Sequence, residues 1–294
     1  MHDRISRPRR SVMYVPAANP RAMAKVRSLD CDAVVFDLED AVAPAMKSEA
    51  RRHLVEAFAT GDFGGRETVI RVNAVQTEDF EHDMDALARC RPDAVLLPKV
   101  EAPDALERVA SACRARALDT SLTLWAMVET PAGLLELDRV ARAGVAQWPA
   151  LDCLVVGTND LAKDTGVATG NGRAYLLPWL MHTVLVARRW GITVLDGVWN
   201  DFADRLGFDA EALQGRQMGF DGKTLIHPSQ IDAANQAFSA APEALAEAQR
   251  VVAAFAAPEH AGAGVIQLQG KMVERLHLAQ AEHLLAMDAA IRAR

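Results

Sequence analysis

The stretch Thr123-Leu124-Trp125-Ala126-Met127-Val128-Glu129-Thr130-Pro131 has the pattern of one strand followed by the start of one helix. Its first six residues are apolar or β-branched, as is typical of a parallel strand buried on both faces. Glu129 ends the run, and Thr130-Pro131 supplies a helix N-cap and a proline at the first helical position. The stretch therefore predicts a βα unit with a carboxylate at the carboxyl end of its strand.

The same pattern, a short apolar run followed by an amphipathic segment, recurs along the 294 residues. A second acid, Asp160, follows the run that ends in Val155-Val156-Gly157. The candidate strands are 11–16, 33–38, 68–73, 94–99, 123–129, 153–157, 192–196 and 222–226. The segments between them predict helices that begin at Asn19-Pro20 and Thr130-Pro131 and that span 47–58, 78–90, 103–117, 178–190, 209–218 and 228–238.

Eight strand–helix units in succession predict an α/β fold, a (β/α)8 TIM barrel. A doubly wound sheet is the alternative, but the chain lacks a glycine-rich phosphate loop. We expect a flexible tail at 1–9, the barrel as the catalytic domain at 10–239, and a C-terminal helical arm at 240–294. The arm is predicted to contain a helix at 242–255, an extended piece at 265–270 and a final helix at 276–291.

The composition limits the class of protein. Half of the residues are hydrophobic, 24% are charged, and the formal net charge is −7. These values are typical of a soluble globular protein and argue against nucleic acid or an anionic membrane as the main partner. The four cysteines have neither C-x-x-C nor zinc-ligand spacing, so we expect reduced thiols in a cytoplasmic protein. We expect neither a signal peptide nor a membrane span.

Active sites of such barrels lie at the carboxyl ends of the strands. Glu129 and Asp160 follow two neighbouring strands and would converge there. Oxygen ligands that leave room for water and substrate suit Mg²⁺, so we predict that these two acids are metal ligands. A helix cap or an ion pair is the alternative for each.

The second and third strands supply further candidates. Arg71 lies within an apolar run and needs a partner, which could be the carboxylate or developing oxyanion of a substrate. An ion pair with Glu39 or Asp40 is the alternative, and it is compatible with that role. Glu39 and Asp40 are candidate catalytic residues, which together with Asp37 would hold metal-bound water and orient Arg71.

The first predicted helix carries Arg21 and Lys25, which are four residues apart and share one face. This pair predicts either a solvated basic face or a phosphate-binding site near the barrel mouth. The remaining polar residues at predicted strand ends are Lys99, Asp196, Lys223 and His227, and of these we expect His227 to be structural.

From Arg10 to about Leu285, the chain resembles the citrate lyase β-subunit-like family of the HpcH/HpaI aldolase superfamily. Each matching segment is weak evidence by itself, but the whole set in this order is specific for the family. The segments are Arg10-Ser11 with Tyr14-Val15-Pro16, Arg21-x-x-x-Lys25, Phe36-Asp37-Leu38-Glu39-Asp40-Ala41-Val42, Ile70-Arg71-Val72-Asn73, Leu97-Pro98-Lys99, Glu129-Thr130-Pro131, Gly157-Thr158-Asn159-Asp160-Leu161, Gly219-Phe220-Asp221-Gly222-Lys223 and Ile226-His227-Pro228-Ser229-Gln230-Ile231.

The resemblance implies a barrel whose C-terminal arm packs on a neighbouring subunit, in a homotrimer or a hexamer. It implies Mg²⁺ bound by Glu129 and Asp160, with Arg71 and Glu129 as substrate-binding residues. Arg21 and Lys25 would contact the phosphates of coenzyme A. Such enzymes cleave or form a C–C bond in 3-hydroxyacyl thioesters of the citramalyl-, malyl- or citryl-CoA type.

The arm departs from the family pattern at one position. Relatives that use coenzyme A carry an aspartate in a Gly-Lys-Met-(Val/Ile)-Asp segment, which supplies a catalytic carboxylate to the neighbouring subunit. This chain has Gly270-Lys271-Met272-Val273-Glu274. Glu274 keeps the carboxylate but adds a methylene, and a misplacement of about 1 Å can cost about 10²-fold in rate. Glu274 is therefore a catalytic candidate with an altered reach, and a solvated acid at a helix start is the alternative.

We therefore expect a Mg²⁺-dependent carbon–carbon lyase that converts a 3-hydroxyacyl-CoA into an acetyl thioester and an α-keto acid. One alternative is a free-acid class II pyruvate aldolase, which would not use coenzyme A. The other is a citrate lyase complex subunit that acts on a substrate bound to an acyl-carrier partner.

Overall fold

The computed structural model describes residues 7–293, which divide into two compact units. One unit is Arg9–Phe238, and the other contains the chain from Ser239 onward. The division lies one residue from the predicted barrel limits at either end. Residues 1–6, most of the predicted tail, lie outside the described residues.

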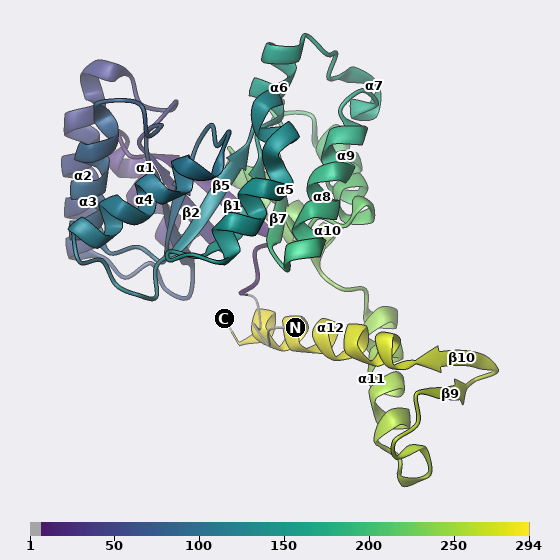
Figure 1. The fold of residues 1–294 in the computed structure, drawn as a ribbon. Coiled ribbons are helices and arrows are strands. Elements are labelled where there is room, and N and C mark those ends of the chain that lie inside the picture. The colour runs from purple at the N-terminus through teal and green to yellow at the C-terminus, as the bar shows by residue number, and fades with distance from the viewer. Residues whose placement is uncertain (1–6, 294) are drawn as a thin grey trace. The chain divides into compact units, whose positions relative to one another are not determined.

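The larger unit is a closed barrel of eight parallel strands in the order β1 to β8, which confirms the predicted fold (Figure 1). Strand β8 pairs with β1 to close it. The strands are β1 (Ser11–Pro16), β2 (Ala33–Asp37), β3 (Glu67–Arg71), β4 (Ala94–Leu97), β5 (Thr123–Val128), β6 (Leu151–Val156), β7 (Thr193–Asp196) and β8 (Gly222–Leu225).

Helices surround the strands, as Figure 1 shows. They are α1 (Pro20–Lys25), α2 (Lys47–Thr60), α3 (Asp79–Cys90), α4 (Pro103–Ala115), α5 (Pro131–Val145), α6 (Thr158–Thr165), α7 (Gly170–Arg173), α8 (Leu177–Trp190), α9 (Arg205–Met218) and α10 (Ile231–Phe238), with 3-10 turns η1 (Val26–Ser28), η2 (Pro44–Met46) and η3 (Pro228–Gln230). The opening stretch behaves as predicted, because Thr130 caps α5 and accepts the Gly133 N–H at 3.0 Å.

The core of the barrel has two layers. The inner layer fills the barrel interior and includes Val35, Val69, Trp125 and Val155. The outer layer lies between the strands and the helices. It contains the alternate residues of each strand, such as Phe36, which follows Val35 of the inner layer. This alternation follows from the two-residue period of a strand, and it decides which polar residues reach the interior.

Arg9 closes the start of the barrel. The sequence placed it in the tail, but its side chain is 4% exposed and donates to Glu67 at 2.7 Å and to Asp152 at 2.5 Å. Its guanidinium also lies 4.7 Å from the centroid of the Trp125 ring. Glu67 begins β3 and Asp152 lies at the start of β6, so Arg9 belongs to the barrel and joins strands across its amino-terminal end.

Most predicted strands were one or two residues too long. β2 ends at Asp37 and β5 at Val128, so Glu39 and Glu129 lie in the turns just beyond them. Helix α9 begins at Arg205, four residues before its predicted start, because Asp204 accepts the Gly207 N–H at 2.9 Å. The hydrophobic pattern alone located neither the ends of these two strands nor the start of α9.

The C-terminal unit has a small core of its own, which includes Val251, Phe255 and Ile266. Its elements are α11 (Pro242–Ala256), η4 (Pro258–His260), the antiparallel strands β9 (Val265–Leu268) and β10 (Lys271–Glu274), and α12 (Arg275–Arg292) (Figure 1). The hairpin was not predicted. Gln269 and Gly270 both have positive φ, 50° and 79°, as a two-residue hairpin turn of type I′ requires.

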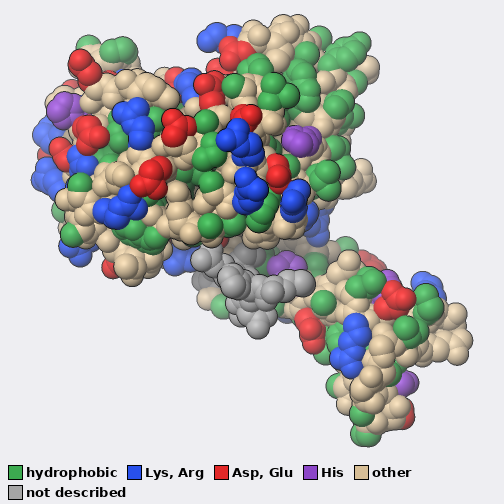
Figure 2. All heavy atoms as spheres, in the orientation of Figure 1, with side chains coloured by type: hydrophobic (Ala, Val, Ile, Leu, Met, Phe, Trp, Pro, Cys, Tyr) green, Lys and Arg blue, Asp and Glu red, His purple; other side chains and the backbone are tan. Residues whose placement is uncertain are grey.

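The surface is mixed in charge. Figure 2 shows acidic and basic side chains interspersed over the outer helices of the barrel unit, as the modest net charge leads one to expect. Among the described residues, no helix combines the length and the apolar character needed to cross a bilayer. The four cysteines are buried, and none is in a disulfide within the described part of the chain.

Candidate active site

Three of the predicted site residues face the interior at the carboxyl ends of their strands. Asp37 follows Val35 by two residues, Arg71 follows Val69, and Glu129 follows Met127, and the three earlier residues belong to the inner layer. Because side chains alternate along a strand, this spacing turns the polar groups toward the same mouth. All three are at least nine-tenths buried.

Arg71 is held mainly by a residue that was not singled out as its partner. Its Nε and Nη2 donate to the two carboxylate oxygens of Asp37, at 2.8 and 2.5 Å. Nη1 lies 2.9 Å from Glu39, whereas Asp40 is 3.9 Å away. The ion pair with Glu39, which the sequence offered as the alternative for Arg71, is present, but Asp37 occupies the bidentate edge of the guanidinium.

Glu39 connects two cations. One oxygen contacts Arg71, and the other accepts a hydrogen bond from the Lys99 ammonium. Burial raises the pKa of Glu39, although Arg71 and Lys99 act to lower it. Asp40 is 61% exposed and lies 3.9 Å from each cation, so its interactions here are weaker.

Lys47 fixes the turn that carries Glu39. Its buried ammonium donates to the backbone oxygens of Leu38 and Glu39, at 2.9 and 3.1 Å, and to the Asn73 side chain at 2.6 Å. Asn73 in turn donates to Asp83. The turn after β2 is thereby tied to the end of β3, which sets the position of Glu39 beside Arg71.

Glu129 is 2% exposed and accepts the backbone N–H of Lys99 at 2.7 Å through Oε1. Its other oxygen faces Gly157, where an added Cβ would lie 2.6 Å from Oε2. Burial raises the pKa of Glu129 to about 7, although the Lys99 N–H and Arg71 act to lower it. A buried carboxylate with one free oxygen is in place to bind a cation.

Asp160 lies in the first turn of α6, whose N-cap is Gly157. It is half-buried, and its side chain makes no hydrogen bond or ion pair with any residue among 7–293. The Asp160 carboxylate and Oε2 of Glu129 are both hard oxygen donors, the kind of ligand that Mg²⁺ prefers. Within the described residues no group of three or more potential ligands is present, so water and substrate would have to complete the coordination.

Charge counting supports the same fit. The proposed site contains five carboxylates, those of Asp37, Glu39, Asp40, Glu129 and Asp160, against the cations of Arg71 and Lys99. A bound divalent cation would offset two of the three excess negative charges, so the metal prediction from the sequence agrees with the residues present.

Asp196 and Lys223 do not join this site, contrary to expectation. Their side chains point out of the barrel interior, toward α9, because each is an odd number of residues from the inner-facing positions of its strand. Lys223 contacts Asp196 at 3.1 Å and Glu211 of α9 at 2.7 Å. Arg173 completes a neutral buried network with Asp196 at 2.7 Å. Burial alone would raise the pKa of Asp196, but Lys223 and Arg173 hold it below its usual value.

Arg21 and Lys25 are exposed on α1, and their side chains make no hydrogen bond or ion pair with the described residues. The two cations are therefore available for an external anion. Arg10, by contrast, pairs with Asp32 at 2.9 Å.

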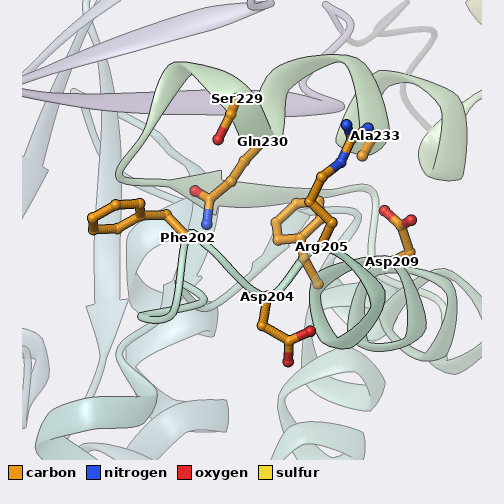
Figure 3. A pocket seen from close by; sticks show the side chains of 8 residues that line it. Phe202, Asp204, Arg205, Asp209, Ser229, Gln230 and Ala233 are labelled. Carbon is orange, nitrogen blue, oxygen red and sulfur yellow. The ribbon is translucent and has the colours of Figure 1, made fainter.

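A small pocket lies between the loop after β7, the start of α9 and the segment of η3 and α10 (Figure 3). It is lined by Phe202, Asp204, Arg205, Phe208, Asp209, Ser229, Gln230 and Ala233. None of the predicted site residues lines it. His227 stacks on Phe202, with 4.8 Å between ring centroids, and its Nδ1 accepts the Ser229 N–H at 3.2 Å, which agrees with a structural histidine.

Glu274 belongs to the C-terminal unit. It is the last residue of β10 and the N-cap of α12, where its N–H donates to His277 Nδ1 at 3.0 Å. It is half-buried within that unit.

Residues 10–228 match the HpcH/HpaI aldolase/citrate lyase family. The chain belongs to this family. A (3S)-malyl-CoA thioesterase of Cereibacter sphaeroides is 45% identical to this HpcH/HpaI family member over 97% of the chain and 96% of the relative. The human mitochondrial citramalyl-CoA lyase is 32% identical over 97% of the chain and 87% of the relative.

Among solved structures, the HpcH/HpaI family member is similar to CitE from Mycobacterium tuberculosis in complex with magnesium, acetoacetate and coenzyme A. The TM-score is 0.73 and the identity 31%, over 95% of this chain and 97% of the other. The match covers nearly the whole chain and includes the C-terminal unit.

Sequence reasoning gave less weight to three residues that shape this site. Asp37 stood among the second-strand acids but was not chosen as the partner of Arg71. Lys99 was noted only as a strand-end cation, although its left-handed backbone, φ 50°, brings both its N–H and its ammonium to the site. Gly157 provides the space beside Glu129. Strand alternation puts Asp37 and Glu39 on one face and Asp40 on the other, so it excludes Asp40 but does not choose between the first two.

Proposed function

We propose that this protein is a Mg²⁺-dependent enzyme that acts on a short 3-hydroxyacyl-CoA thioester of the malyl type. The observation that carries the proposal is the buried Glu129, whose Oε2 lies beside Gly157, the N-cap of the helix that bears Asp160. The magnesium and coenzyme A in the CitE structure support the metal and the thioester. The names of the malyl- and citramalyl-CoA relatives support a hydroxyacyl group.

Glu129 and Asp160 would hold the metal, which supplies Lewis-acid polarisation worth several kcal/mol at a substrate oxygen. Arg71 lies beside them as a fixed positive charge that stabilises negative charge developing on the substrate acid. The buried surroundings strengthen this effect, because the local dielectric constant is lower than that of water. Arg21 and Lys25 would hold the phosphates of coenzyme A outside the mouth.

The first candidate reaction is carbon–carbon cleavage. The C3 hydroxyl of the malyl group loses its proton to a carboxylate, for which Glu274 and Glu39 are the candidates. The bond between C2 and C3 then breaks, and its electron pair passes to the acetyl thioester as an enolate. Protonation of the enolate carbon releases acetyl-CoA, and the other product is glyoxylate. The lyase relatives support this reaction.

The second candidate reaction is thioester hydrolysis, which the 45% identical relative favours by its name. Water adds to the thioester carbonyl, the C–S bond breaks, and coenzyme A leaves as a free thiol. The other product is malate. The same metal and the same anion-binding residues would hold the hydroxy acid in both reactions, so the position of bond cleavage distinguishes them.

One product analysis tests both. The purified protein is incubated with malyl-CoA and Mg²⁺, and glyoxylate, acetyl-CoA, malate and free coenzyme A are quantified. Equal amounts of glyoxylate and acetyl-CoA indicate cleavage, and equal amounts of malate and coenzyme A indicate hydrolysis. Glu129→Gln should abolish either reaction. The proposal is wrong if neither pair of products forms.

A further inference from the structure

The position of Lys99 makes it more than a strand-end cation. Its backbone has φ 50°, a left-handed conformation that non-glycine residues rarely adopt and that tends to persist at functional sites. In this conformation the N–H donates to Glu129 while the ammonium contacts Glu39. One residue thus touches both the predicted metal ligand and the acid that pairs with Arg71.

The geometry of Arg71 limits how it can bind a substrate acid. Its Nε and Nη2 edge holds Asp37 in a bidentate pair. Asp37 is 1% exposed and also accepts the N–H groups of Glu39 and Ala41, at 2.8 and 3.1 Å. A substrate carboxylate would have to expel this buried acid to take the bidentate edge, and leaving such an acid unpaired would be strongly unfavourable.

Lys99 does not have this limit. Its side chain is 40% exposed, whereas those of Arg71 and Glu39 are 9% and 7% exposed. An ammonium has three donors. Glu39 accepts from Lys99, and the Asp40 carboxylate is 3.9 Å away. Donors on Lys99 therefore remain for an incoming anion, while Glu39 fixes the position of the ammonium.

We propose that Lys99 is a substrate-binding residue whose ammonium pairs with the free carboxylate of the acid, while Arg71, locked by Asp37, supplies a fixed charge behind it. This inference rests on the proposed function and names the residue that selects for an acid group. Lys99 increases the affinity for a substrate that has a free carboxylate, and it does not increase the affinity for one that lacks it.

The test is direct binding of two probes in the presence of saturating Mg²⁺. Glyoxylate carries the carboxylate, and acetyl-CoA lacks it. Titration calorimetry is performed on the parent protein, Lys99→Met, Lys99→Arg and the control Arg108→Met. Methionine meets the same backbone constraint as lysine but removes the charge. Arg108 is an exposed cation on α4, in the same βα unit, with no partner among the described residues.

Lys99→Met should bind glyoxylate at least about tenfold more weakly, as expected for the loss of a charged hydrogen bond. Its affinity for acetyl-CoA should change by less than about twofold. Lys99→Arg should recover most of the glyoxylate affinity, and Arg108→Met should resemble the parent. A Lys99→Met protein that binds glyoxylate as tightly as the parent, or that loses both probes equally, overturns the assignment of Lys99. If the parent binds neither probe, the proposed function fails as well.

Discussion

At the scale of single residues, the most consequential property is the pKa of Glu129, which burial raises to about 7. A metal ligand must be deprotonated, so with Glu129 as a proposed Mg²⁺ ligand we expect protons and Mg²⁺ to compete for this carboxylate near neutral pH. Solvent-exposed glutamates titrate near pH 4.3 and would show no such competition in this range.

We therefore predict that Mg²⁺ affinity depends on pH through Glu129. Above pH 7 the affinity should be constant, and below it the affinity should fall by up to about tenfold per pH unit. Calorimetric titration between pH 5.5 and 8.5 measures this. Asp160→Asn should weaken binding but keep the same pH dependence, whereas Glu129→Gln should remove the dependence. An equal slope in parent and Glu129→Gln would show that another group is responsible.

The same pKa also affects stability without metal. Because the folded pKa lies above the unfolded value, the stabilisation from Glu129 is fully present below about pH 4.3 and is lost as the pH rises through 7. The loss is on the order of 3 kcal/mol. The protein without Mg²⁺ should thus lose more stability over this range than Glu129→Gln, and urea unfolding at pH 5 and 7.5 compares the two.

The residue types of the site were predictable because strand alternation and strand-end placement are local rules. Arg71 and Glu129 lie where those rules put them. The pairing of Arg71 with Asp37 was not predicted, because three acids lie close together at the end of β2 and in the turn after it, and Lys47 fixes that turn. Lys99 reaches the site through a rare backbone conformation that its sequence does not specify.

At the scale of elements, α1 carries Arg21 and Lys25, which we propose hold the phosphates of coenzyme A. The helix is short, Pro20–Lys25, and buries only Met23. Its two exposed cations are not neutralised by any acid in the described residues. An element with such a small apolar face contributes little to the core, so its charges can be removed without unfolding the barrel.

We predict that Arg21→Ala combined with Lys25→Ala weakens acetyl-CoA binding by about tenfold or more, since charged hydrogen bonds to phosphate are lost. Glyoxylate binding should be unchanged. Calorimetry with each ligand checks this, and Arg89→Ala combined with Arg108→Ala is the control for loss of two exposed charges. Unchanged acetyl-CoA affinity in the double variant would show that other residues hold the phosphates, whereas a parent protein that binds no acetyl-CoA would favour the free-acid aldolase.

The order of the elements was readable from the sequence, because eight buried apolar runs separated by amphipathic segments leave few alternatives. Their ends were less predictable. The start of α9 depends on the Asp204 cap, and the hairpin β9–β10 depends on two positive φ angles at Gln269 and Gly270. The direction of the Asp196 side chain was misjudged. Asp196 directly follows Leu195, which faces the interior, so alternation along the strand turns Asp196 outward.

At the scale of the whole molecule, the barrel unit contains Glu129, Asp160 and Arg71, and the C-terminal unit contains Glu274. We propose, from the family resemblance, that the C-terminal unit acts as an arm that brings Glu274 to the mouth of a neighbouring subunit in a homotrimer or hexamer. A site built from two chains has a distinctive consequence, because defects in different chains can then complement each other.

The last prediction uses this consequence. Glu129→Gln and Glu274→Gln should each be inactive alone, since one lacks a metal ligand and the other a proton acceptor. When differently tagged copies are co-expressed and mixed oligomers are purified through both tags, about a third of the sites in a mixed trimer, or about a quarter in a mixed hexamer, should combine an intact barrel with an intact arm, and activity should return to that level. Glu282→Gln, an exposed acid on α12, is the matched control and should be active alone. Mixed oligomers that stay inactive would rule out an arm acting between subunits, and an active Glu274→Gln protein would exclude that carboxylate from proton transfer.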